Sequence, residues 1–443
     1  MINIEEIAQG REVFENTRLG DDERFRLDSG GDINNEWNRW SYKAHDFPSL
    51  RLICDTTGEV RLLGQSGVLW SWENPIDALE WVGSTFNEAP MEGPPFKGGW
   101  IGHFSYDLGR WFETVPVKAI NDLNWPLFEL SWHDEVLAHD RATGKNFKIL
   151  LKAPPAESSP VEWFMAQPTL RKWEWPHKSN FTREQYERAV GKALDYIAAG
   201  DVFQVNLSQR FELPMRRWPL DVYRELQKKF PAGFGALLYY ENHALISNSP
   251  ELFLRVDGRQ VTTRPIKGTR PRREGMEREL RNSAKDQAEL NMIVDLERND
   301  LGRVCEIGSV KVKSARDIEA LPTVYHGVAT IEGMLREDVR LVELLRATFP
   351  GGSVTGAPKI RAMEIIEELE PSRRGPYCGA IGYLSADGQI GLNVAIRTIV
   401  MKDSVAYVSV GGGIVADSNP KDEYEETLVK ASAMFDVLGV GPC

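Results

Sequence analysis

The stretch NFTREQYERAVGKALDYIAAGDVFQVNLSQRFEL, residues 180–213, contains a helix signal followed directly by a strand signal. Thr182 and Gln185 have the spacing of a capping box, and Gly200 stands where the helix that they begin would end. In DVFQVNLSQRFEL, polar and apolar residues then alternate with the period of a half-buried strand. We therefore predict a helix that leads into a strand.

Residues on either side support this interpretation. Phe181 and Tyr186 occupy the two positions of a hydrophobic staple around the predicted helix start. The segments GALLYY (235–240) and HALISNS (243–249) alternate like strands and are close enough to form a hairpin. Antiparallel hairpins interspersed with helices favour an α+β fold over regularly alternating βαβ units.

The same periodicities predict further elements in the second half of the chain. Helices are expected at 284–303, 338–348, 358–369 and 420–438, and strands at 379–385, 391–401 and 405–411.

The chain divides into three parts by composition. Residues 1–151 contain short strand-like stretches, residues 152–180 are rich in proline, serine and tryptophan, and residues 181–443 hold the elements above. We interpret the middle part as a connection, and we expect the two flanking regions to be interleaved in one compact unit.

Charge and cysteine usage exclude several classes of protein. The net charge of −12 argues against a nucleic-acid-binding surface, so an anionic substrate would need a local basic pocket. The four cysteines form no CxxC pair, which indicates reduced thiols. Because no apolar leader and no long apolar run is present, we expect a cytoplasmic protein without a membrane span.

Two predicted helices carry acidic residues on one face. Asp286 and Glu289 are three residues apart, while Glu423, Glu426 and Lys430 share one face of the last helix. Such faces are usually solvated, but two acidic pairs that converged would form a site for a hard cation such as Mg²⁺. Spacing alone leaves both interpretations open.

Two glycine-rich stretches are typical of tight turns. GGSVTGAPK (351–359) lacks the Lys-Ser/Thr of a P-loop, and GGGIVADS (411–418) lacks the GxGxxG fingerprint. They bind no nucleotide in this interpretation, although such backbone can approach a small ligand closely.

The segment TTRPIKGTRPRR, residues 262–273, places Lys267 among several arginines. Positive neighbours favour the neutral amine, so Lys267 is either a nucleophile or a structural cation. The segment alone does not choose between the two.

Seven motifs together resemble the chorismate-utilising enzymes. They are SPELFL (249–254), TTRPIKGTRPR (262–272), SAKDQAELNMIVDLERNDLGRV (283–304), FPGGSVTGAPKIRAMEIIEELEP (349–371), GAIGYLS (379–385), AIRTIV (395–400) and GGGIVADSNPKDEYEET (411–427). The resemblance implies an anthranilate synthase component I-like fold, with four layers, α/β/β/α, and two large antiparallel sheets packed orthogonally.

The resemblance also implies the site. Glu289 and Glu426 would bind Mg²⁺, with Asp286 and Glu423 beside them or acting through water. The residues that would bind the substrate are Gly268, Thr269, His326, Tyr377, Arg397, Thr398, Gly411, Gly413 and Lys430. Arg397 and Lys430 would meet the two carboxylates of chorismate.

Single positions indicate a branch of the family. Water-adding relatives have a lysine base where Gln204 stands, and Gln204 can hydrogen-bond ammonia instead. Lys267 and Thr398 resemble the branch that forms 4-amino-4-deoxychorismate for 4-aminobenzoate and folate synthesis. There Lys267 would attack C2 and Glu251 would protonate the leaving C4 hydroxyl.

Two alternatives stay open. Anthranilate synthase component I adds ammonia at C2, and a non-catalytic paralogue would keep only an N-terminal tryptophan pocket. FRLDSGG (25–31) offers Leu27, Asp28 and Ser29 for such a pocket. We expect ammonia from solution or from a separate glutamine amidotransferase subunit.

Overall fold

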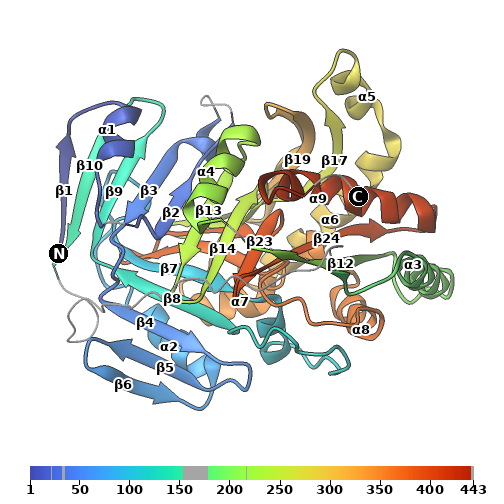
Figure 1. Ribbon diagram of the computed structural model, residues 1–443, viewed down its shortest axis with the longest axis horizontal. Helices are drawn as coiled ribbons and strands as arrows, with labels where there is room; N and C mark the ends of the chain where they lie inside the picture. Colours follow the sequence, from blue (N-terminus) through green and yellow to red (C-terminus); the bar gives the residue numbers. More distant parts are fainter. Residues whose placement is uncertain (21, 32–34, 153–177, 216, 441–443) are drawn as a thin grey trace.

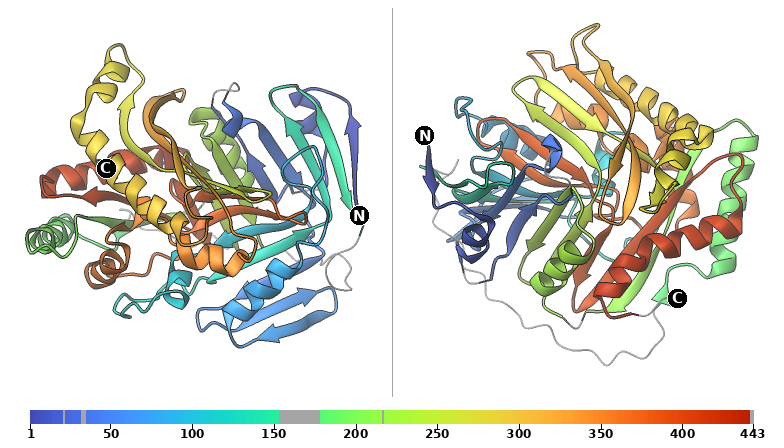
Figure 2. Two further views of the ribbon diagram at one scale, coloured as in Figure 1. Left: turned by 180° about the vertical axis from the view of Figure 1, so that it is seen from behind. Right: turned by 90° about the horizontal axis from the view of Figure 1, so that it is seen from above.

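The computed structural model describes residues 1–20, 22–31, 35–152, 178–215 and 217–440 (Figure 1). The predicted connection at 152–180 falls mostly outside these residues. The described part of the chain folds into two large antiparallel sheets with helices on both outer faces, which is an α+β architecture (Figures 1 and 2).

The first sheet combines strands from both ends of the chain. Its order is β1 (Ile2–Ile7), β10 (Asn146–Leu151), β9 (Glu135–Asp140), β3 (Trp40–Ala44), β2 (Phe25–Asp28), β13 (Phe234–Tyr239), β14 (His243–Ser249), β23 (Thr398–Lys402), β24 (Val405–Ile414), β12 (Gln204–Pro214) and β11 (Lys178–Ser179), with β20 (Gly356–Ala357) on β12.

The second sheet is built in the same way. Its order is β17 (Ile266–Pro271), β19 (Val324–Met334), β16 (Gln260–Arg264), β15 (Leu252–Asp257), β22 (Ile390–Val394), β21 (Ala380–Ser385), β7 (Gly99–Phe104), β8 (Phe128–His133), β4 (Leu50–Cys54), β5 (Val60–Gly64) and β6 (Gly67–Trp72), with β18 (Lys311–Ala320) on β19.

Each 12-stranded sheet therefore takes five strands from residues 1–151 and the other strands from residues 178–443. The halves join where β2 pairs with β13 and where β7 pairs with β21. Backbone hydrogen bonds run without a gap across both junctions, so the two regions of the chain share one fold.

Helices cover the outer faces. They are α1 (Arg11–Asn16), α2 (Pro75–Ser84), α3 (Arg183–Ala198), α4 (Pro219–Lys229), α5 (Met276–Asn282), α6 (Ala284–Gly302), α7 (Leu341–Thr348), α8 (Lys359–Leu369) and α9 (Pro420–Val437), with 3₁₀ turns η1 (Glu36–Asn38), η2 (Tyr106–Trp111) and η3 (Gly352–Val354). Helices α4 and α9 pack on the first sheet, whereas α2, α6 and α7 lie on the opposite side of the molecule, as seen from behind in Figure 2. In the described residues, no helix is both long and apolar enough to cross a membrane.

The largest apolar core lies between the sheets. It joins Phe25 and Tyr42 of the first sheet to Leu52 and Trp100 of the second. A second core lies under α4 and α9, where Phe211 packs edge-on against Phe435 at 5.2 Å between ring centroids. Burial on both faces of the first sheet explains why its central strands read as mostly apolar.

The predicted start of α3 is confirmed. Thr182 and Gln185 form the capping box, and the rings of Phe181 and Tyr186 meet at 5.7 Å. These contacts are local in sequence, which is why the pattern alone was sufficient to predict them.

The prediction of one continuous strand at 391–401 was wrong. The chain leaves the second sheet after Val394 and enters the first at Thr398. Between them Arg397 adopts φ +51, a left-handed conformation that ends strand pairing. The apolar pattern continues across the break because both strands are buried, so periodicity could not reveal the change of sheet.

Candidate active site

A cleft of about 590 Å³ opens between the two sheets and α9. It is lined by residues from segments far apart in the sequence. They include Asn206, Glu251, Lys267, Gly268, Thr269, Arg270, Lys285, Asp286, Glu289, His326, Ser353, Tyr377, Arg397, Gly411, Gly412, Gly413, Glu423, Glu426 and Lys430.

The cleft exists because β24 is longer than its neighbour. Pairing between β23 and β24 stops at Val408, whereas β24 stays paired with β12 up to Ile414. The opposite edge of residues 409–413 therefore faces the cleft, where Lys430 Nζ donates to the carbonyl of Gly411 at 2.8 Å. Strand length and the break at Arg397 together leave this backbone open to a ligand.

Lys267 enters the cleft from an irregularity in β17. The pairing with β19 shifts register between Lys267 and Thr269, and Gly268 has φ +79. A Cβ on Gly268 would lie 2.7 Å from Leu280 and 2.9 Å from the carboxyl carbon of Asp286, so only glycine fits. The Lys267 ammonium donates to the carbonyl of Ser353 at 3.3 Å.

Burial is the main reason why the pKa of Lys267 is lowered, and the positive charge of Lys430 lowers it further. The negative charges of Glu251 and Glu289 raise it and so oppose this shift. The arginines of the same segment contribute little because they point elsewhere: Arg264 pairs with Glu319, and Arg270 contacts Glu279 and Asp286. The expectation that positive neighbours favour the neutral amine is met by Lys430 instead of these arginines, and burial contributes more than either.

Glu251 is buried within electrostatic reach of this amine. Burial raises the pKa of Glu251 to about 7, although the hydroxyl of Ser353 and the charge of Lys267 lower it. Ser353 thus contacts both groups: its hydroxyl donates to Glu251, and its carbonyl accepts from Lys267. A carboxyl that titrates near neutrality suits a general acid.

Acidic side chains of α6 and α9 line the facing wall. Burial, together with nearby carboxylates, raises the pKa of Glu289 and of Glu423. Lys430 forms an ion pair with Glu426 at 2.6 Å, and it brings the pKa of Glu426 below its usual value despite burial. Asp286 is held by Arg270 at 2.9 Å.

These carboxylates suit a divalent cation that keeps part of its water shell. In the described part of the chain, no three His, Cys, Asp or Glu side chains are close enough to form a complete metal cage. Mg²⁺ is commonly held by one or two carboxylates together with waters and an anionic substrate. Burial first, and then the charge of neighbouring carboxylates, raise the pKa of Glu289 and of Glu423, and a bound cation would offset both effects.

Cations and neutral donors also line the cleft. The guanidinium of Arg397 donates to the backbone carbonyl of Lys430 at 3.2 Å, whereas the Lys430 ammonium is turned to Glu426 and to the carbonyl of Gly411. The imidazole of His326 shares a hydrogen bond with the hydroxyl of Thr269 at 2.9 Å. Burial, aided by Arg397, lowers the pKa of His326 to about 4, which leaves the ring neutral.

Two predicted site residues lie outside the cleft lining. Gln204 is fully buried, and the hydroxyl of Thr398 contacts Ser247 and the carbonyl of Ile396. The analysis of the sequence missed Ser353 and Asn206, both of which line the cleft. Ser353 lies in the stretch assigned to a tight turn, and nothing in its local pattern indicates a contact with Lys267.

Comparisons with known proteins show the family of the chain. Residues 55–436 match the family described as chorismate binding enzyme. The chain belongs to the chorismate-binding enzymes.

Members of this family with different names are similar to the chain. Aminodeoxychorismate synthase component 1 of Escherichia coli is 41% identical over 381 residues, covering 83% of each chain. Anthranilate synthase component 1 of Pseudomonas aeruginosa is 37% identical over 434 residues, covering 91% of this chain and 88% of its own. The crystal structure of anthranilate synthase component I from Streptococcus pneumoniae superposes with a TM-score of 0.77 at 30% identity, covering 92% of this chain and 98% of its own.

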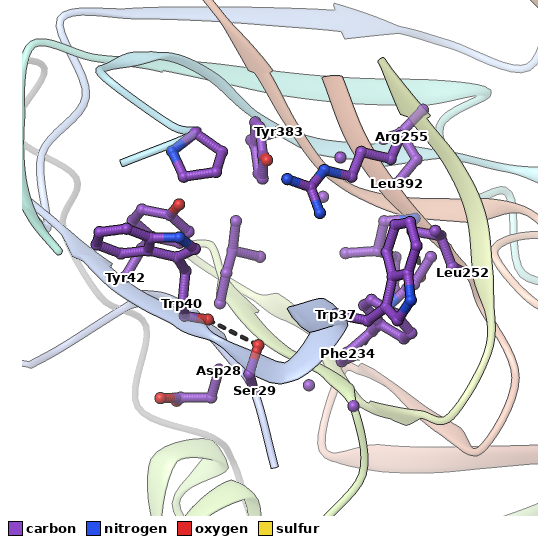
Figure 3. A pocket seen from close by; sticks show the side chains of 18 of the residues that line it. Asp28, Ser29, Trp37, Trp40, Tyr42, Phe234, Leu252, Arg255, Tyr383 and Leu392 are labelled. Atoms are coloured by element: carbon purple, nitrogen blue, oxygen red, sulfur yellow. Dashed lines mark hydrogen bonds between the residues drawn. The ribbon is translucent and has the colours of Figure 1, made fainter. Parts of the chain in front are cut away.

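This chorismate-binding enzyme has a second pocket at the junction of its two regions (Figure 3). Leu27, Asp28 and Ser29 line it, as the pattern at 25–31 predicted. Trp37 and Trp40 stand on opposite sides, and the guanidinium of Arg255 points between them (Figure 3).

The polar residues of this pocket are engaged in different ways. The carboxylate of Asp28 is turned to Arg26 and Tyr223, at 3.0 and 2.9 Å. The hydroxyl of Ser29 donates to the carbonyl of Trp40 at 2.7 Å. The pocket therefore offers aromatic walls and one guanidinium to a ligand.

Proposed function

We propose that this enzyme aminates chorismate with ammonia to 4-amino-4-deoxychorismate, through a transient adduct on Lys267. The observation that carries the proposal is the pairing of a desolvated lysine with a buried carboxyl at one end of the cleft. A lysine becomes nucleophilic when its pKa falls, and an acid with a pKa of about 7 is protonated often enough to assist a leaving group.

Lys267 and Glu251 supply the nucleophile and the proton that the proposed reaction needs. The neutral amine of Lys267 attacks C2 while the C4 hydroxyl takes the proton of Glu251 and leaves as water. Ammonia then bonds to C4, and the electron pair of the C2–N bond returns to the lysine nitrogen. The Glu251 carboxylate removes one proton from the new ammonium group and is ready for the next cycle.

The charges of the cleft support a dianionic substrate. Arg397 and Lys430 would bind its carboxylates, and Tyr377, His326 and the backbone of residues 411–413 would surround its ring. Mg²⁺, held by Glu289 and Glu426 with Glu423 close by, would neutralise a substrate carboxylate in a protein whose net charge is −12.

The second candidate function is anthranilate synthesis. It is favoured by relatives that carry this name at similar identity, such as the Pseudomonas aeruginosa protein at 37%. The two functions differ in the atom that ammonia attacks, C4 or C2, and Lys267 is the residue expected to decide between them.

Variants of Lys267 test the proposal. With chorismate and Mg²⁺ but no ammonia, wild-type protein should gain a covalent adduct on Lys267, visible by intact and peptide mass. Lys267→Ala and Lys267→Arg should lose the adduct and nearly all 4-amino product. Arginine keeps the charge but is not an amine nucleophile, so normal turnover by Lys267→Arg would refute the proposal.

We further propose that a glutamine amidotransferase subunit supplies the ammonia. The name component 1, carried by the relatives, supports a two-component enzyme. Ammonium salts should support turnover by this chain alone, and glutamine should do so only after the partner is added.

We also infer that the N-terminal pocket binds tryptophan. Its aromatic walls suit an indole, and Arg255 suits the carboxylate. Calorimetric titration should show binding that Arg255→Ala abolishes, and heat changes equal to those of buffer would contradict this assignment.

A further inference from the structure

Among the residues that the structure describes, two amide side chains on β12 have polar atoms without a hydrogen-bond partner. Gln204 is fully buried and Asn206 is 7% exposed, yet both polar atoms of the Gln204 amide and Oδ1 of Asn206 are unpaired in the described structure. Buried amides in folded proteins nearly always have partners, so an unpaired one calls for an explanation. A small ligand that donates hydrogen bonds would supply it.

The two amides lie on one side of the strand beside the open backbone of β24. They are two residues apart, so they project to the same face of the sheet. A Cβ on Gly411 would lie 3.0 Å from Oδ1 of Asn206, and one on Gly413 would lie 2.9 Å from Nε2 of Gln204. The glycines thus leave room for the amides, and Asn206 lines the cleft with Gln204 behind it.

The backbone of Asn206 is held firmly. Its N–H donates to the carbonyl of Thr355 at 2.8 Å, and its carbonyl accepts from Arg374 at 2.7 Å. Arg374 is itself fixed by an ion pair with Glu370 at 2.7 Å. The unpaired side chain is therefore presented to the cleft from a rigid position, which is typical of a ligand contact.

We propose that the amide of Asn206, backed by Gln204, binds ammonia at the floor of the cleft and directs it to the substrate. This inference rests on the proposed amination and adds a nucleophile-binding residue that touches ammonia itself. The carbonyl oxygen of the amide accepts an N–H of ammonia, and the lone pair of the nitrogen stays free to form the bond to carbon.

The chemistry of the surrounding groups favours ammonia over part of chorismate as the ligand. The substrate carboxylates are matched by the cations Arg397 and Lys430, which face the cleft from other elements. An uncharged acceptor also favours a positively charged ligand much less than a carboxylate would, and a carboxylate would stabilise the unreactive ammonium ion. A neutral amide is thus better suited to hold the reactive form.

Asn206→Leu, which removes the amide at similar size, tests the proposal. At saturating chorismate and Mg²⁺ we expect the KM for ammonium to rise about tenfold or more, the factor expected for a lost hydrogen bond in a buried site. The KM for chorismate and the formation of the Lys267 adduct without ammonia should be unchanged. Asn206→Val is a second variant with a side chain that suits a strand interior, in case the leucine variant does not fold.

Asn146→Leu is the matched control. Asn146 is a fully buried amide of the same sheet, and its side chain donates hydrogen bonds to the carbonyls of Ala8 and Gly10. This substitution should lower the melting temperature without changing the KM for ammonium. An unchanged KM for ammonium in both Asn206 variants would overturn the proposal, as would a rise confined to the KM for chorismate. A wild-type enzyme that forms no adduct would contradict the Lys267 mechanism instead, while the ammonium measurement would still test Asn206.

Discussion

At the scale of single residues, Ser353 links the two groups that carry out the proposed chemistry. Its hydroxyl bond favours the ionised form of Glu251 and so lowers a pKa that burial has raised to about 7. A general acid must be protonated, so adduct formation should decline as the pH rises through this value.

Ser353→Ala should move that decline to higher pH. Without the hydroxyl, the ionised form of Glu251 loses a stabilising bond, so the pKa of Glu251 rises further. The check is the rate of adduct formation, measured by quenched mass spectrometry. A range of about pH 6 to 9 covers the expected decline. A shift to lower pH would contradict the assigned role of Glu251, whereas Ser309→Ala, at a half-buried serine that bonds to Glu306 and Met334 instead, should leave the profile unchanged.

Glu289 and Glu426 carry the prediction about Mg²⁺. Glu289→Gln and Glu426→Gln should each reduce turnover by about a hundredfold or more, the scale on which metal-site residues act. They should also abolish the rise in melting temperature that Mg²⁺ gives the wild type, because binding to the native state alone stabilises it. Retention of that rise in both variants would rule out these carboxylates as ligands. Glu279→Gln, on the exposed side of α5, is the control.

At the scale of secondary structure elements, the irregularity in β17 positions Lys267. Gly268→Ala should cost about 1–2 kcal/mol of unfolding free energy for its left-handed backbone. It should also reduce turnover strongly, because the new methyl group would collide with Leu280 and Asp286.

Gly258 provides the matched comparison in the turn between β15 and β16. It has φ +59 but nothing within 4 Å of the position of a Cβ. Gly258→Ala should therefore lower stability by a similar amount and leave turnover unchanged. Urea unfolding and steady-state rates distinguish the two, and equal rates for both alanine variants would contradict the proposed role of the irregularity.

At the scale of the whole molecule, both sheets cross from one region of the chain to the other. A fragment of residues 181–443 would leave β13 without β2 and β21 without β7, which exposes two central strand edges. We expect this fragment to lack a cooperative thermal transition and to aggregate, and the full chain to unfold in one transition. Calorimetry would contradict this if the fragment alone unfolded cooperatively.

The sequence predicted those features that depend on neighbouring residues. The capping box of α3 and the strand alternation of β12 follow from local hydrogen bonds and from side-chain periodicity. The acidic faces of α6 and α9 follow from helical spacing as well. Most of the residues that the resemblance of the motifs named lie around one cleft.

Only the tertiary structure decided how these elements meet. The apolar run at 391–401 is divided between the sheets at Arg397, because burial in either sheet demands the same pattern. Burial in the tertiary structure is the main cause that lowers the pKa of Lys267, and the charges that modify it come from Glu251, Glu289 and Lys430, none of which neighbours Lys267 in the sequence. The sequence by itself thus determined the elements and their polar faces. Long-range packing decided which charges lie close to one another. The reason is that electrostatic effects depend on distance and burial rather than on order along the chain.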